Sequence, residues 1–474
     1  MASASINIKM YNVGELGDCF LLTIKTGKVT RYILIDCGSF RNGKKSSDRL
    51  IEVVKDIKKQ IKKSKINVAV GTHQHNDHLS GYVHAESLFK QIGIEQIWLS
   101  WLDNPSDSQA AKIGDSHKGL RKALHQASAK MEKMLLENGA NNKAYAPKMR
   151  NTKEMVDGLL GFFGAAPELP SKGIENLKKM GDKPVEYLSP GEIIAIPGIP
   201  LTDIKVYVLG PPKNEKLLYR KDPKAGESYD PLNAMNYMAG NFLASLDNLS
   251  DGNNQEEEQF PFNSTYKQFV KKGNLSPDLS TLIKSYKDTL NQWRNIDHDW
   301  LDQAARLALY MDTFTNNSSL ILAIELVRVN KFLLFAADAQ TGNWVSWWDV
   351  KFDNNLSIDN LLAKTVFYKV GHHGSHNATL KDALEKMTHD ELVAMIPVHK
   401  KDPNITKPNG WKMPAKNLYK RLKEKTNYRV IRMEDGFADD CDPTKNPLAK
   451  AAWKKLTSQP IAKEGALYQE FEVS

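Results

Sequence analysis

The sequence has little cysteine and lacks both a long apolar run and a targeting segment. Only three cysteines occur in 474 residues, an odd number that is too small for a disulfide framework. No run of about 18 apolar residues is present, and the first residues do not join a basic segment to an apolar one. These absences argue against membrane-spanning and disulfide-stapled classes, and they predict a cytoplasmic protein with no membrane partner.

Composition also argues against wholesale disorder. Hydrophobic residues make up 41% of the chain and aromatic residues 9%, which is enough to build a substantial core. The length exceeds the size at which one core usually stops growing, so a large domain with insertions is expected. The net charge of +9 weakly favours a polyanionic partner such as a nucleic acid.

Alternating and apolar runs predict a layered α/β domain in the first part of the chain. The expected strands there are 6–13, 19–24, 32–35, 66–70 and 94–102. Ser46, Ser47 and Asp48 are expected to cap a helix over 48–64. Strands that alternate with helices favour a sheet whose carboxyl ends carry the chemistry.

The later part of the chain repeats this pattern around two insertions. Strands are expected at 185–188, 192–196, 204–209, 320–326, 332–336, 361–370 and 394–399. The segment 105–181 is rich in Lys, Met, Ala and Gln and is expected to be an inserted helical segment. The second insertion, 213–297, is polar and is expected to hold a mobile loop at 252–258. We therefore predict a single domain over 1–474 with two inserted, mainly helical segments.

The most informative stretch follows the apolar run 66–70. It contains three imidazoles and one carboxylate, which packing does not require: His73, His75, Asp77 and His78. A loop leaving a strand end can turn His73 and His75 toward one point, and Asp77 and His78 toward another. Imidazole nitrogen and carboxylate oxygen suit zinc, manganese or iron, and two such ions about 3.5–4 Å apart form a two-metal hydrolytic centre.

Further candidate ligands stand at three later strand ends. They are Asp338, the pair His372 and His373, and His399. A lone Asp after a strand is usually a turn residue, but repeated placement at strand ends is what a composite metal site needs. Glycines on both sides of the His pair let the backbone bring those imidazoles close to a metal or a phosphate oxygen.

Taken in chain order, these pieces resemble the metallo-β-lactamase superfamily. Its signature is a His-x-His-x-Asp-His loop followed by a distant Asp and a later His. More narrowly, the chain resembles the branch that contains the metallo-β-lactamase domain of the competence protein ComEC. The matching segments are 12–20, 33–38, 73–78, 209–212, 316–320, 335–338 and 369–375. The resemblance implies a four-layer αββα sandwich with its site at one edge, between the two sheets.

The resemblance also implies a set of metal ligands. His73 and His75 would hold the first of two divalent ions, zinc or manganese. Asp77 and His78 would hold the second, and Asp338 would bridge them. Asp77 and Asp338 would also orient the attacking water, and both are therefore counted as catalytic.

The later histidine pair would complete the centre. Either His372 or His373 would be a ligand of the second metal; His373 is preferred, with His372 acting catalytically on the scissile phosphate. The remaining candidates would support the metal loop or lie near the substrate, and they are Asp36, Ser375, His376 and His399.

The chain departs from the branch it resembles at three places. ComEC-type domains commonly carry Asp at the position of His75. The histidine that many relatives supply to the first metal has no match, because 316–319 occupies that region. The late His-Pro of the family is matched only by Met413-Pro414, and His399 could substitute for it.

The function predicted from these residues is a metal-dependent phosphodiesterase, a nuclease acting on DNA. One alternative is a small-molecule hydrolase of phosphodiesters, lactones or esters, with a cap built from the insertions. The other is an effector of a multi-protein defence system, activated by a protein partner that docks on the insertions.

Overall fold

The computed structural model describes residues 4–138, 146–162, 169–220, 276–288, 290–291, 299–407, 410–437 and 439–474. The polar loop expected at 252–258 lies outside these residues. The chain forms two compact units. The first consists of 1–115, 160–231 and 312–474, and the second of 116–159 and 232–311. Among the described residues, no helix is both long and apolar enough to cross a membrane.

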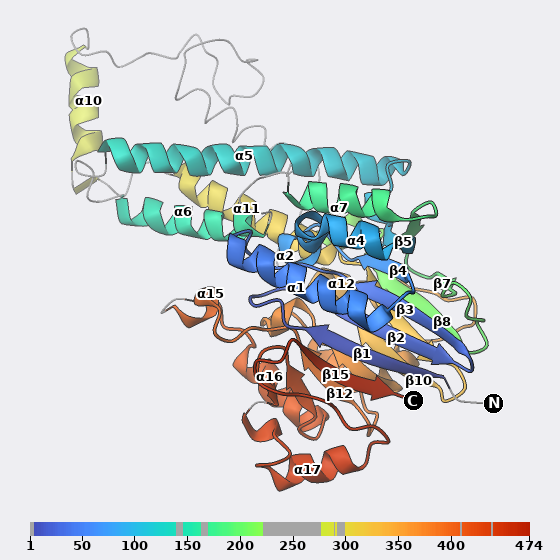
Figure 1. Cartoon of the computed structure of the whole chain (residues 1–474). Helices are drawn as coiled ribbons and strands as arrows, with labels where there is room; N and C mark the ends of the chain where they lie inside the picture. The colour runs from blue at the N-terminus through green and yellow to red at the C-terminus, as the bar shows by residue number, and fades with distance from the viewer. Residues whose placement is uncertain are drawn as a thin grey trace. The chain divides into compact units, whose positions relative to one another are not determined.

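Two mixed sheets form the first unit (Figure 1). Within the described residues, one sheet has seven strands in the order β15-β1-β2-β3-β4-β5-β6, and the other has eight in the order β14-β13-β12-β11-β10-β9-β8-β7. The strands of the first sheet are β1 (Ser5–Tyr11), β2 (Phe20–Thr26), β3 (Val29–Ile35), β4 (Ile66–Gly71), β5 (Ile94–Ser100), β6 (Glu186–Leu188) and β15 (Tyr468–Val473). Those of the second are β7 (Ile193–Ile194), β8 (Ile204–Gly210), β9 (Ile321–Leu326), β10 (Lys331–Phe335), β11 (Thr365–Lys369), β12 (Val393–Ile396), β13 (Val430–Arg432) and β14 (Gly436–Phe437).

A single apolar core joins the two sheets. Leu22 of β2 and Val68 of β4 belong to the same buried cluster as Leu333 of β10. Phe20 of the first sheet meets Phe335 of the second edge to face, with ring centroids 6.0 Å apart. Each such side chain contributes roughly 1.5–3 kcal/mol when it is fully buried. The prediction of a mixed α/β fold with two strand-rich layers is thus confirmed.

Helices complete the first unit. They are α1 (Lys44–Ile61), α2 (Asn76–Leu79), α3 (Gly81–His84), α4 (Glu86–Ile92), α7 (Leu169–Met180), α8 (Glu215–Leu218), α12 (Thr341–Ser346), α13 (Ile358–Ala363), α14 (Lys381–Lys386), α15 (Pro403–Thr406), α16 (Lys416–Lys425) and α17 (Pro447–Lys454). The α1 helix buries Leu50, Val54 and Ile57 in the core, as their helical spacing predicts.

The expected cap of α1 is wrong. The helix begins at Lys44, its N-cap residue is Gly43, and no side chain caps it. Ser46, which was expected to cap, lies inside the helix and donates from Oγ to Glu15 Oε1 at 3.1 Å. The Ser46 hydroxyl therefore bonds to a residue distant in the sequence and does not cap the helix.

The strand expected over 361–370 is also wrong in its first half. Residues up to Ala363 belong to α13, where Ser357 Oγ accepts from Asn360 N at 3.2 Å and caps the helix start. Only Thr365–Lys369 form β11. Leu361 and Leu362 are buried on the helix, and a short apolar run does not distinguish a buried helical turn from a strand.

The strand order brings several carboxyl ends to one edge. In the first sheet β3 and β4 are parallel neighbours. In the second, β10 pairs in parallel with β11, and β11 with β12. The loops that follow these strands carry the histidines and aspartates singled out in the sequence.

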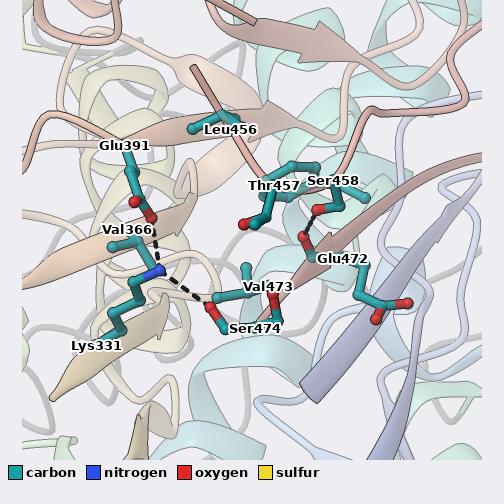
Figure 2. Close-up of a pocket in the computed structure, with 10 residues that line it drawn as sticks. Lys331, Val366, Glu391, Leu456, Thr457, Ser458, Glu472, Val473 and Ser474 are labelled. Atoms are coloured by element: carbon teal, nitrogen blue, oxygen red, sulfur yellow. Dashed lines mark hydrogen bonds and ion pairs between the residues drawn. The ribbon is translucent and has the colours of Figure 1, made fainter. Parts of the chain in front are cut away.

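The last strand closes the other edge of the first sheet. β15 pairs antiparallel with β1, with Ile6 opposite Val473. Figure 2 shows how the residues beside it are fastened: Lys331 Nζ donates to Glu391 Oε2 at 2.7 Å and to the carbonyl oxygen of Ser474 at 3.0 Å. The cavity there is about 10 Å³, room for at most one water molecule, so these contacts are structural.

The described part of the second unit is helical. Its helices are α5 (Ser108–Asn138), α6 (Ala146–Gly161), α10 (Pro277–Lys287) and α11 (Asp299–Asn317), of which α5, α6 and α11 extend into the first unit. Ion pairs link α6 to its neighbours: Lys153 to Glu132 of α5 at 3.1 Å, and Lys148 to Asp302 of α11 at 2.9 Å.

Candidate metal centre

The histidine loop runs from the end of β4 into α2 and is held from behind by Asp36. Thr72 donates from its backbone N to Asp36 Oδ1 at 2.9 Å and from Oγ1 to Asp36 Oδ2 at 2.7 Å. His78 donates from Nδ1 to the same Oδ2 at 2.7 Å. Asp36, with a positive φ of 55°, thereby positions both the loop and one imidazole. This is the supporting place that the resemblance implied.

Glycine at position 38 allows the close approach of the loop. A Cβ added at Gly38 would lie 2.4 Å from the backbone of Asp77 and of His78, which no real side chain tolerates. The backbone N of the neighbouring Cys37 donates to the His78 carbonyl at 2.8 Å. The segment after β3 and the histidine loop therefore pack backbone against backbone.

One group of ligand atoms gathers around Asp338. Its Oδ2 lies 3.2 Å from His78 Nε2 and 3.6 Å from His373 Nε2. His373 Nε2 is also 3.0 Å from Asp77 Oδ2. All four side chains are fully buried. His373 donates from Nδ1 to the Pro397 carbonyl at 2.7 Å, so its Nε2 faces Asp77 and Asp338.

The first histidine pair forms a second, adjoining group. His73 Nε2 lies 3.1 Å from His75 Nδ1, and the His73 and His78 ring centroids are 4.1 Å apart. His73 Nδ1 is turned to Thr72 Oγ1 at 3.1 Å and to Ser319 Oγ at 3.3 Å. Ser319 belongs to the segment 316–319, which therefore contacts His73 through a hydroxyl.

The group around Asp338 could hold a metal ion. Asp18, His78, Asp338 and His373 offer ligand atoms that all lie within 4.8 Å of one another. Asp77 Oδ1 is buried without a hydrogen-bond partner, and His78 Nε2 and Asp338 Oδ2 are buried with no geometric hydrogen bond beyond the ion pair that they form at 3.2 Å. Since an unsatisfied buried polar atom is costly, a cation that accepts these lone pairs would repay that cost. The group could therefore hold a metal.

Sequence reasoning missed two residues of this cluster, Asp18 and Lys369. Lys369 is the last residue of β11, and its ammonium contacts Asp18 Oδ2, the Ala337 carbonyl at 2.7 Å and Asp338 Oδ1 at 3.4 Å. The side chains of Lys369 and Asp18 are each 2% exposed. Asp18 lies within the segment 12–20 that the resemblance singled out, and this was the available signal. No local pattern indicated the role of Lys369.

The loops that carry the ligands include strained backbone. Ala337, His372 and His373 have positive φ angles of 42°, 42° and 51°. Such conformations cost of order 1–3 kcal/mol each for residues other than glycine. The His372 N–H donates to the Ala337 carbonyl at 3.1 Å and to Asp338 Oδ1 at 3.1 Å. Together with Lys369, these bonds hold the two strained turns against each other.

The remaining predicted site residues are His372, Ser375, His376 and His399, and they differ in burial and in hydrogen bonding. His372 is buried, and its Nδ1 lies 2.8 Å from Ser375 Oγ, which in turn donates to Asn377 Oδ1 at 2.8 Å. His376 is exposed. His399 follows β12 and is half-buried; its carbonyl accepts from Asp402 N at 2.9 Å, and it is not a member of either ligand group.

Electrostatics divide the histidines into two kinds. Burial lowers the pKa of His73 well below its usual range, that of His75 to about 3 and that of His372 to about 4. Burial acts the same way on His78 and His373, but neighbouring carboxylates, Asp338 first, outweigh it. They raise the pKa of His78 well above its usual range and that of His373 to about 9.

Metal binding is therefore expected to release protons. The pKa of His373 in the metal-free fold is about 9, above its ordinary 6.5. The protonation of His373 therefore stabilises the folded protein, and this stabilisation is fully present below about pH 6.5. It is lost as the pH rises through about 9. A cation must displace the same proton, so its affinity should rise between these pH values. Calorimetry with Zn²⁺ at pH 7.5 should show heats that depend on the ionisation enthalpy of the buffer.

Two variants control this measurement. His373→Gln should release fewer protons, whereas His376→Ala, which changes an exposed histidine in the same turn, should behave as the wild type. Equal heats in two buffers of different ionisation enthalpy would show that no protonated ligand is displaced.

No family model matches the chain, and no curated protein is a significant match to it. The geometry of the cluster is therefore the basis on which a function can be assigned.

Proposed function

We propose that the chain has a metallo-β-lactamase fold and hydrolyses phosphodiesters with two divalent metal ions, its substrate being DNA. The observation that carries the proposal is the convergence on Asp338: the Nε2 atoms of His78 and His373 lie 3.2 and 3.6 Å from one carboxylate oxygen. The Nδ1 atoms of both rings are tied behind, to Asp36 and to the Pro397 carbonyl. Such outer hydrogen bonds orient metal-binding histidines in proteins.

The residues present fit two ions. His73 Nε2 and His75 Nδ1 would hold one, and Asp77, His78 and His373 the other, with Asp338 between them. Nitrogen and carboxylate donors of this kind suit zinc or manganese. When bound, the ions would supply Lewis acidity toward the phosphoryl group and lower the pKa of a water molecule.

The protein's own groups would orient the reactants. Asp77 Oδ1 is buried without a hydrogen-bond partner and can accept a hydrogen bond from the attacking water. His372 adjoins His373 and is braced by Ser375, so its ring can be held toward a phosphoryl oxygen. Lys369 contacts Oδ1 of Asp338, which favours the orientation of Oδ2 toward the histidines. These groups act by positioning and by electrostatic stabilisation.

Two considerations favour DNA over a small ester. The net charge of +9 attracts polyanions, and the resemblance to the ComEC branch points to nucleic acid. Neutralised phosphates release counterions, so binding to a polyanion weakens steeply with added salt, whereas binding to a small neutral ester does not.

The purified protein loaded with Mn²⁺ or Zn²⁺ is expected to cleave single- or double-stranded DNA, at a rate that falls steeply with salt. His75→Ala should lower the rate by at least the 10–100-fold typical of losses around a metal. The measurement is gel-resolved cleavage with metal analysis of each variant, and Asp182→Ala, which changes a surface carboxylate paired with Lys65, serves as the control.

Two results would contradict the proposal. One is that DNA and RNA stay intact under all metals while a small ester or lactone is turned over, which would favour the small-molecule hydrolase. The other is that folded His75→Ala retains both full activity and full metal content.

A further inference from the structure

Three aromatic rings form a cluster beside the histidine loop. Phe40, Phe162 and Trp411, the ring cluster, come from three separate segments of the first unit. The Phe40 and Phe162 centroids are 4.7 Å apart and those of Phe40 and Trp411 5.4 Å. Trp411 stacks on Phe162 with centroids 5.2 Å apart and an interplanar angle of 17°. The cluster thus combines one stacked pair with edge-to-face contacts, the arrangements that aromatic rings prefer.

The ring cluster is attached directly to the first histidine pair. The Phe162 ring lies 5.1 Å from the ring of His75, with an interplanar angle of 33°. The Phe162 carbonyl accepts from Asn76 N at 2.5 Å, and the Phe40 carbonyl accepts from Asn76 Nδ2 at 2.7 Å. Asn76 stands between His75 and Asp77. The cluster is therefore hydrogen-bonded to the loop that carries His75 and Asp77.

The same cluster is tied to the loop that carries His372 and His373. Ala415, four residues beyond Trp411, donates from its backbone N to the Gly374 carbonyl at 2.7 Å. A Cβ at Gly374 would lie 2.9 Å from Pro414 Cβ, so the two loops are in close contact. Trp411 thus belongs to a segment that packs on one ligand loop, while its ring stacks on a residue bonded to the other.

Exposure differs within the ring cluster. Phe40 and Phe162 are buried, whereas Trp411 is half-buried. The Arg41 guanidinium lies at the edge of the ring cluster, 5.7 Å from the Phe40 centroid, and its side chain is one-third exposed. Arg41 is held there by Asp402, with both oxygens at 3.1 Å. The half-buried Trp411 thus offers an indole to a planar group, while Arg41, which pairs with Glu15 at 3.3 Å as well as with Asp402, lies beside the Phe40 ring of the cluster.

From these contacts we infer that Trp411, backed by Phe162 and Phe40, is a stacking site for a nucleobase of a single-stranded polynucleotide, next to the phosphate that the metal centre acts on. The inference rests on the proposed function, because it places a base beside a phosphate bound at the histidines. Every base has an aromatic face, so such a site accepts a strand without reading its sequence. It identifies the substrate class as single-stranded nucleic acid rather than an isolated phosphodiester.

The test compares a labelled oligo(dT) with an abasic strand of the same length and backbone. Binding by fluorescence anisotropy and cleavage by the Mn²⁺-loaded protein are measured for wild type, Trp411→Ala and Trp411→Phe. Trp411→Ala is expected to weaken binding of oligo(dT), and to lower kcat/KM for it, by about tenfold. The abasic strand should be unaffected, and Trp411→Phe should recover most of the loss because it keeps a ring.

The matched control is Trp348→Ala. Trp348 is a surface tryptophan, 38% exposed, which donates from Nε1 to Asp359 at 2.8 Å. Its loss should change neither the binding nor the cleavage of either strand. If Trp411 only fastened the loops, Trp411→Ala would reduce activity on both strands alike, and this result would overturn the inference. Failure of the wild type to prefer oligo(dT) over the abasic strand would overturn it too. The wild type could bind oligo(dT) more tightly than the abasic strand, and Trp411→Ala could lose this preference, while no metal supports cleavage. That result would uphold the inference and refute the proposed hydrolysis.

Discussion

Replacement of Asp338 by Ala is expected to lower DNA cleavage by roughly 10³-fold or more, the largest effect on activity of any single change. Asp338 Oδ2 is the one atom approached by both His78 and His373. Its removal takes away the negative charge beside both imidazoles and, under the proposed function, the carboxylate between the two ions. Measurement of kcat/KM together with metal content would show a joint loss.

Two comparisons make this result specific. Asp338→Asn keeps the shape of the side chain but removes the charge, and a comparable loss would assign the effect to the carboxylate. Asp182→Ala is the surface control, since Asp182 is half-exposed and pairs with Lys65 at 2.8 Å. A folded Asp338→Ala protein within tenfold of wild-type activity would show that the site has been misassigned.

Replacement of Lys369 by Met is expected to give the largest loss of stability, about 3–5 kcal/mol. The ammonium of Lys369 is the buried partner of Asp18, and Met removes the positive charge nearest to that carboxylate, leaving only the more distant imidazoles of His78 and His373 at 3.9 and 3.7 Å. Asp18 and then Asp338 raise the pKa of Lys369 against the opposing effect of burial, so its ammonium stays protonated at neutral pH. Urea unfolding with a chelator present measures the fold apart from metal binding.

A double variant separates the ion pair from packing. Asp18→Asn combined with Lys369→Met removes both charges, and it should be more stable than the sum of the two single losses predicts. Additive losses would mean that the two groups do not interact energetically. Lys331→Met is the matched control, because Lys331 also ends on a carboxylate and a carbonyl but is partly exposed.

The ligand loops could be placed from the sequence because each follows an apolar run. His73 and His75 come after β4, Asp338 after β10 and His373 after β11. Since these strands lie in parallel sets, their carboxyl ends had to share an edge. Strand periodicity therefore carried most of the information about the site.

Other features depend on tertiary partners that no local pattern records. Asp18 and Lys369 form an ion pair although about 350 positions separate them in the sequence. A lysine at the end of an apolar run does not indicate that it has a buried partner. Ser46 does not cap the helix as expected, because its hydroxyl donates a hydrogen bond to Glu15. The ring cluster joins Phe40, Phe162 and Trp411, none of which stands in a periodic segment. Contacts of this kind follow only from the folded geometry.

The contact between Asp77 and His373 spans 296 positions of the chain. At translation rates of about 5–20 residues per second, roughly 15–60 seconds separate the synthesis of these two residues. During that interval the nascent chain carries the histidine loop without Asp338 or His373. The cluster of buried aspartates and histidines is consequently completed late in synthesis, after the strands β10 and β11 have been made.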